Sequence, residues 1–133
     1  MFQPKSVPES KFKPEHLGAT ALAAFFSIAT AWGLTADDER TLLGSPPRST
    51  FFKWKSERQA KLPQDTLERI SYVMGIYKAL HILLPTSQAA DAWVKKPNAA
   101  PITNGKSALE RMRGGRVVDL ADVRRYLDAQ RGW

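Results

Sequence analysis

The chain has 133 residues, no cysteine and two histidines, His16 and His81. The lack of cysteine excludes a disulfide framework, a thiolate zinc site and a thiol nucleophile, and two histidines are too few for most metal or histidine-based catalytic centres. We therefore expect no enzyme activity, no metal and no cofactor. Lys and Arg number 20 against 13 Asp and Glu, a net charge of +7 that favours a polyanion or an acidic protein surface as the partner.

The segment 1–14 contains several prolines and charges of both signs, and it is interpreted as a flexible tail. Apolar residues then recur every three or four positions, which predicts an amphipathic helix ended by Gly33. These residues are Leu17, Ala21, Leu22, Phe25, Ile28, Ala29 and Trp32. The stretch is rich in alanine and contains glycine and hydroxyl residues, so it is too weakly apolar for a membrane span. The segment before it contains prolines and charges of both signs, so it is not a secretion signal. A cytoplasmic protein without membrane contact is expected.

Residues 15–62 are predicted to form a helix-turn-helix DNA-binding region. An acidic helix start at Thr35 is followed by a stop at Gly44 and by a second, basic helix. The cations of this second segment are Arg48, Lys53, Lys55, Arg58 and Lys61. A helix that enters the major groove needs small polar residues and cations at its exposed start. The residues predicted to contact DNA are Arg48, Ser49, Thr50, Lys53 and Lys55.

Several residues of this segment also have a purely structural interpretation. Trp54 could stack on a base, but Phe51 and Trp54 lie three apart on one helical face, which favours core packing. The lysines could form a merely solvated face, whereas the preceding helix and turn favour DNA contact. Arg48, next to Pro47, could equally be a loop cation without a partner.

The longest predicted helix spans 65–84, with Asp65 and Glu68 in a capping arrangement and Pro85 at its end. One apolar row contains Leu67, Ile70, Met74, Tyr77, His81 and Leu84, and a second contains Val73, Ile76, Leu80 and Leu83. Two apolar rows predict a central helix, and they exceed what one small bundle covers, so we expect a homodimer. His81 is interpreted as a core or interface histidine and not as a ligand.

The remainder is predicted to be helical as well. A helix over 86–96 ends at Pro97, and Asn98 follows as a turn former. Ser107 and Glu110 form a capping box for a short helix that ends at Gly114 and Gly115, and Asp119 caps a final helix that runs to about Gln130. The fold class is therefore all-α.

The chain resembles the antitoxins of the Xre/MbcA/ParS family over about residues 20–133. The resemblance rests on the order of six segments: STFFKWK (49–55), LPQDTLERI (62–70), GIYKAL (75–80), AW (92–93), PN (97–98) and VRRYL (123–127). It implies an Xre-like helix-turn-helix in the amino-terminal half. It also implies that residues 63–133 form a small helical region for toxin binding and dimerisation.

The resemblance further implies a function. Such antitoxins bind and inactivate a RES-domain toxin that degrades NAD or uses it to ADP-ribosylate a target, and many also bind their own promoter DNA. The residues expected to bind the toxin are Arg124, Arg125, Tyr126, Asp128, Arg131, Gly132 and Trp133. A guanidinium or aromatic group at the chain end suits a cleft that accommodates a dinucleotide. The alternative is a stand-alone helix-turn-helix repressor whose carboxy-terminal half dimerises or senses a ligand.

Overall fold

The computed structural model describes residues 14–132, so Trp133 and all of the predicted tail except Pro14 lie outside the described residues. Within that range the chain forms seven helices, namely α1 (Pro14–Ala31), α2 (Ala36–Leu42), α3 (Arg48–Glu57), α4 (Gln64–Leu83), α5 (Ser87–Trp93), α6 (Ala108–Met112) and α7 (Val117–Gln130). An isolated bridge between Pro97 and Ser107 is the only β-type pairing among these residues. The predicted all-α class is confirmed.

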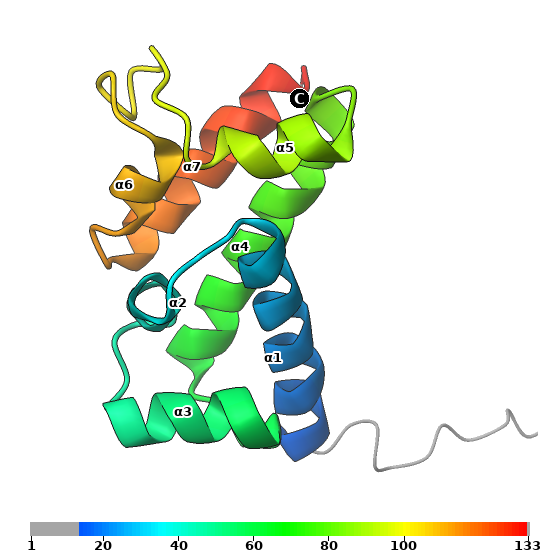
Figure 1. Cartoon of the computed structure of the whole chain (residues 1–133), viewed down its shortest axis with the longest axis vertical. Helices are drawn as coiled ribbons and strands as arrows, with labels where there is room; N and C mark the ends of the chain where they lie inside the picture. Colours follow the sequence, from blue (N-terminus) through cyan, green and yellow to red (C-terminus); the bar gives the residue numbers. More distant parts are fainter. Residues whose placement is uncertain (1–13, 133) are drawn as a thin grey trace, which may run out of the picture.

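Helix α4 is the central element. It packs against α1, α5 and α7, and it runs between α3 at one end of the long axis and α5 at the other (Figure 1). Its fully covered side chains are Ile70, Val73, Ile76, Ala79 and Leu80. Both halves of the chain therefore share one apolar core along this helix, which confirms its predicted central position.

Not every residue of the predicted apolar rows is buried. Leu17 on α1 is 50% exposed and Met74 on α4 is 44% exposed, whereas most of the α1 row and the second α4 row are covered. Most of the apolar surface of α4 is buried within one chain, because α1, α5 and α7 pack against it. The homodimer remains a prediction.

Two predicted helix caps are misplaced. α4 begins after Pro63, so Asp65 lies inside the first turn, where its carboxylate accepts a hydrogen bond from Arg69 Nε at 2.9 Å. α7 begins at Val117, and Asp119 caps it from within the first turn by accepting the backbone N–H of Arg116 at 3.1 Å. The helix predicted over 86–96 is also shorter, because α5 ends at Trp93.

Arg69 joins the two halves of the molecule. Arg69 is 8% exposed. Its Nη1 donates a hydrogen bond of 2.9 Å to the carbonyl oxygen of Gly115, in the turn before α7. The same guanidinium lies beside Gly44, where a Cβ atom would stand 3.0 Å from Arg69 Nε. One side chain of α4 thus contacts both the turn of the helix-turn-helix and the turn that starts α7.

Replacement of Arg69 by alanine should lower the free energy of unfolding by about 2 kcal/mol, because the Gly115 carbonyl loses a charged donor and the guanidinium packing is lost. Urea denaturation followed by circular dichroism measures this change. Arg125→Ala is the matched control, since that side chain is 77% exposed and its pair with Asp122 should contribute well under about 1 kcal/mol. Equal stability of the two variants would contradict the joining role of Arg69.

Candidate functional site

Helices α2 and α3 form a helix-turn-helix. The Thr35 hydroxyl accepts the backbone N–H of Asp38, and the Asp38 carboxylate accepts the backbone N–H of Thr35, each at 3.0 Å. These bonds satisfy amides that would otherwise be unpaired at the start of α2. Gly44 and Ser45, both with positive φ, then reverse the chain before α3. The predicted helix, stop and second helix are confirmed.

One side of α3 is fixed to the rest of the domain by aromatic packing. Phe51 is 1% exposed and Trp54 is 7% exposed, and the Phe51 ring lies 6.1 Å from the Phe26 ring of α1. Core packing of Trp54, favoured from the sequence, is confirmed. The opposite side of α3 is consequently held in a defined orientation toward solvent.

Lys55, one of the predicted DNA contacts, makes an internal ion pair. Its Nζ lies 2.7 Å from Oε1 of Glu39, and Glu39 is only 4% exposed. The ammonium also lies 5.7 Å and 5.9 Å from the ring centroids of Phe26 and Phe51. Lys55 therefore neutralises a buried carboxylate of α2, which gives it a structural task.

The outward side of α3 presents the other predicted DNA contacts. Arg48 and Ser49 are exposed and Thr50 is half-buried, and the Arg48 guanidinium stands 3.8 Å from the Asp37 carboxylate. Lys53 is exposed, and within residues 14–132 its ammonium makes no ion pair. Sequence reasoning omitted Phe52, which is 49% exposed on this same side.

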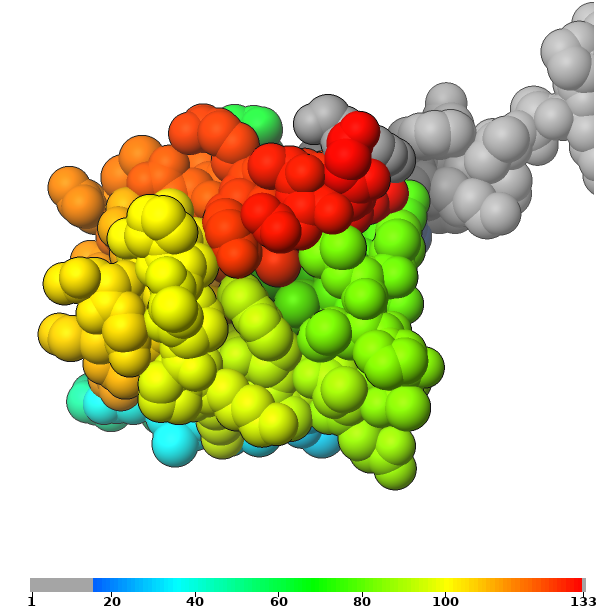
Figure 2. All heavy atoms as spheres, turned by 90° about the horizontal axis from the view of Figure 1, so that it is seen from above, coloured from blue at the N-terminus to red at the C-terminus, as the bar shows by residue number. Residues whose placement is uncertain are grey.

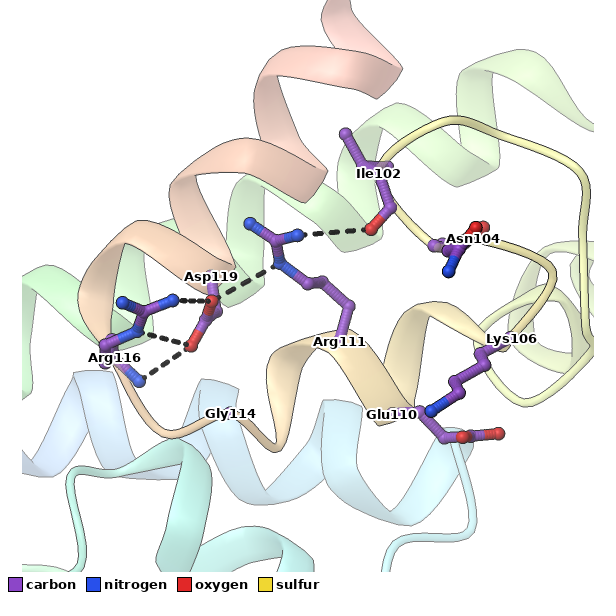
Figure 3. A pocket seen from close by; sticks show the side chains of 9 residues that line it. Ile102, Asn104, Lys106, Glu110, Arg111, Gly114, Arg116 and Asp119 are labelled. Carbon is purple, nitrogen blue, oxygen red and sulfur yellow. Dashed lines mark hydrogen bonds and ion pairs between the residues drawn. The ribbon is translucent and has the colours of Figure 1, made fainter.

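In the other half of the chain, α7 is anchored at its start through Asp119. Asp119 is 2% exposed, and its carboxylate lies 3.3 Å from both Arg111 Nε and Arg116 Nη2 (Figure 3). Burial alone would raise the pKa of Asp119, but the backbone N–H of Arg116 and the two guanidinium groups outweigh it and lower that pKa. Arg111 also donates to the carbonyl oxygen of Ile102 and pairs with Asp122. The start of α7 is thus fixed to α6 and to the preceding loop.

The predicted toxin-binding residues occupy different positions on α7. The Arg124 guanidinium covers Gly75 of α4, where an added Cβ would stand 2.5 Å from it. Arg125 is the most exposed of these cations, with 77% of its side chain accessible. Tyr126 packs on the core edge, and Asp128 lies 3.6 Å from Arg124 and 3.5 Å from Arg131.

Arg131 and Gly132 end the described part of the chain. The Arg131 side chain is only 10% exposed, so it lies against the fold. Gly132 is exposed with φ +81°. Trp133, the last predicted toxin contact, lies outside the described residues.

Two shallow hollows flank Arg125 on the outer side of α7. The first is lined by Tyr72, Ala121, Arg124, Arg125, Asp128 and Ala129. The second is lined by Ile102, Asp122, Arg125, Tyr126 and Ala129. In Figure 2, α7 (orange to red) and the segment around residue 100 (yellow) lie side by side on this end of the molecule. Tyr72 and Ile102 join the candidate surface only through the fold, so sequence spacing gave no signal for them.

His81 is half-buried, its Nε2 lies 3.0 Å from Oδ1 of Asp91, and its ring centroid lies 4.1 Å from that of Tyr77 with the planes tilted by 37°. It connects α4 to α5, and it is not enclosed in the core. Across residues 14–132, no three His, Asp or Glu side chains are grouped as metal ligands require. None of the helices in this part of the chain combines the length and apolar character that a membrane crossing needs.

The fold and these two surfaces define a helix-turn-helix protein with an appended helical binding region. Residues 17–75 match the antitoxin Xre-like helix-turn-helix domain. Residues 79–132 match the antitoxin Xre/MbcA/ParS C-terminal toxin-binding domain. The chain belongs to the Xre/MbcA/ParS antitoxin family. It is also 55% identical over 111 residues to a Sinorhizobium fredii protein named uncharacterized protein y4oB, with 84% of each chain covered.

Replacement of Asp119 by asparagine should lower the free energy of unfolding by about 1–3 kcal/mol at pH 7, because charge-assisted hydrogen bonds to a buried carboxylate are lost. Since the folded-state pKa is lowered, the carboxylate stabilises the fold above its unfolded-state pKa of about 4, and that contribution disappears as the pH falls through the folded-state value. The difference between wild type and variant should therefore shrink below about pH 4. Urea denaturation at a series of pH values measures it, with the exposed Asp37→Asn as control. A difference that does not change with pH would contradict the assignment.

Proposed function

We propose that this protein neutralises a RES-domain toxin that consumes NAD, and that it also represses its own operon by binding promoter DNA. The observation that carries the proposal is the separation of two surfaces on one continuous core. Helix α3 lies across one end of the molecule, whereas α7 runs alongside α4 toward the opposite end (Figure 1). A protein built in this way can hold a toxin and DNA without competition for the same residues. It acts as an inhibitor and not as an enzyme.

For toxin binding, the proposal centres on Arg125 and on the chain end. A highly exposed guanidinium between two shallow hollows suits carboxylates on a partner, because arginine forms bidentate pairs with such groups. Small side chains, Ala121 and Ala129, line these hollows and allow close approach. Since Arg131 is largely covered, the role of entering an NAD-sized cleft passes to Gly132 and Trp133 in this proposal.

For DNA binding, the proposal rests on α3 and its cations. Arg48 and Lys53 are exposed on α3, whereas Phe51 and Trp54 are buried, and a recognition helix turns its exposed side to the major groove. Helix-turn-helix proteins commonly bind two half-sites as dimers. A homodimer on promoter DNA, located with its toxin in the cytoplasm, is part of this proposal.

Two charge reversals should separate the toxin and DNA activities. Arg125→Glu should weaken toxin inhibition at least tenfold in an NAD-consumption assay, because it places an acid where the partner's acidic groups are expected. Promoter affinity should stay unchanged. Arg48→Glu, at a similarly exposed arginine on α3, is the matched control and should show the opposite pattern. Deletion of residues 132–133 should also release toxin activity. If Arg125→Glu and the truncated protein, each at equal stoichiometry with the toxin, both inhibited NAD consumption fully, the α7 site would be refuted.

Lys53→Ala should weaken promoter binding and flatten the dependence of log affinity on log salt by about one unit per lost phosphate contact. Its thermal unfolding midpoint should not change, since the ammonium is exposed. Lys55→Ala should instead lower thermal stability, because it leaves the buried Glu39 carboxylate without its cation. Fluorescence anisotropy with promoter DNA and thermal scans separate the two effects. Unchanged salt dependence in Lys53→Ala would show that this lysine is only solvated.

A further inference from the structure

The exposed ring of Phe52 is the feature of α3 that phosphate binding does not explain. It is 49% exposed in the middle of a helix whose other aromatic residues, Phe51 and Trp54, are buried. Ser49 and Ser56 lie three and four residues away, so they are its neighbours on the helix surface, and Lys53 follows it directly; all three are exposed. The exposed surface of α3 therefore combines small hydroxyl residues and the cations Arg48 and Lys53 with one apolar ring.

The orientation of this ring is restricted by the core. Phe52 makes an edge contact with Phe51, with ring centroids 5.0 Å apart and planes at 70°, and Phe51 is itself 1% exposed. An apolar side chain held in this way loses little conformational freedom on binding. The small side chains of Ser49 and Ser56 on the same side let a groove floor approach the helix closely.

In the DNA major groove, the thymine C5-methyl is the apolar group available to such a ring, and phenylalanine is among the residues that contact it. The neighbouring Lys53 and Arg48 supply the charge complementarity to a polyanion that an apolar protein partner would not require. We propose that Phe52 is a specificity-determining residue that contacts a thymine methyl in each half-site of the promoter. This inference rests on the proposed DNA binding, and it names thymine as a base that α3 recognises.

The test uses the full-length protein and promoter duplexes in which each thymine of the bound site is replaced, one at a time, by deoxyuridine, which lacks the methyl group. For the wild type, one position per half-site should weaken binding about fourfold, the value expected for loss of one buried methyl contact. Phe52→Ala should bind more weakly than wild type and should be insensitive to deoxyuridine at that position. Phe52→Leu should keep part of the sensitivity, because it retains an apolar contact.

Val118→Ala is the matched control, since Val118 is 46% exposed on α7 and should affect neither binding nor discrimination. Unchanged thermal unfolding midpoints establish that the variants are folded. Wild-type binding that is equal on all deoxyuridine duplexes, or equal discrimination in Phe52→Ala, would overturn the assignment of Phe52 while DNA binding itself would stand. If Phe52→Ala lost toxin inhibition and kept promoter affinity, the ring would serve a protein contact and the inference would be wrong. Failure of the wild type to bind the promoter at all would remove both the inference and the DNA half of the proposed function.

Discussion

The buried guanidinium of Arg69 is the interaction on which the relative placement of the two halves depends. It lies at the start of α4, pairs with Asp65, donates to the Gly115 carbonyl and stands beside the turn that contains Gly44. A planar cation with several fixed donors can satisfy such separate groups at once. Arg113 adds a second connection, since its guanidinium lies 3.2 Å from the buried carboxylate of Asp38. The helix-turn-helix and the start of α7 are therefore held to each other through charged groups as well as through the core along α4.

This arrangement divides the cations of a strongly basic chain into two sets. Lys55, Arg69 and Arg111 neutralise carboxylates or cap carbonyl groups inside the fold. Others remain mostly exposed, and among them Arg48 and Lys53 lie on α3 while Arg125 lies on α7. Net charge alone could not distinguish a DNA partner from an acidic protein partner. The positions of the exposed cations are consistent with both partners, one on α3 and one on α7.

Much of the fold could be predicted from local sequence patterns, because helix periodicity and end signals are short-range. The helix starts at Thr35 and Ser107 were predicted correctly for this reason, although at Ser107 the structure shows only the hydroxyl half of the predicted capping box. Asp65 and Asp119 were assigned to the wrong cap positions, since a carboxylate inside the first turn gives the same sequence pattern as one at the cap. The ion pair of Lys55 could not be predicted, because its partner Glu39 lies on a different helix, 16 residues earlier. Phe52 could have been found, because burial of Phe51 and Trp54 on one helical face already requires that Phe52 point elsewhere.

Hydrogen–deuterium exchange of the full chain, alone, with the proposed RES-domain toxin and with promoter DNA, tests the central claim of two separate surfaces most directly. The account predicts that toxin slows exchange in α7 and the adjoining loop around residue 102 but not in α3. It predicts that DNA slows exchange in α3 but not in α7. Protection of α3 by the toxin, with α7 unchanged, would contradict it.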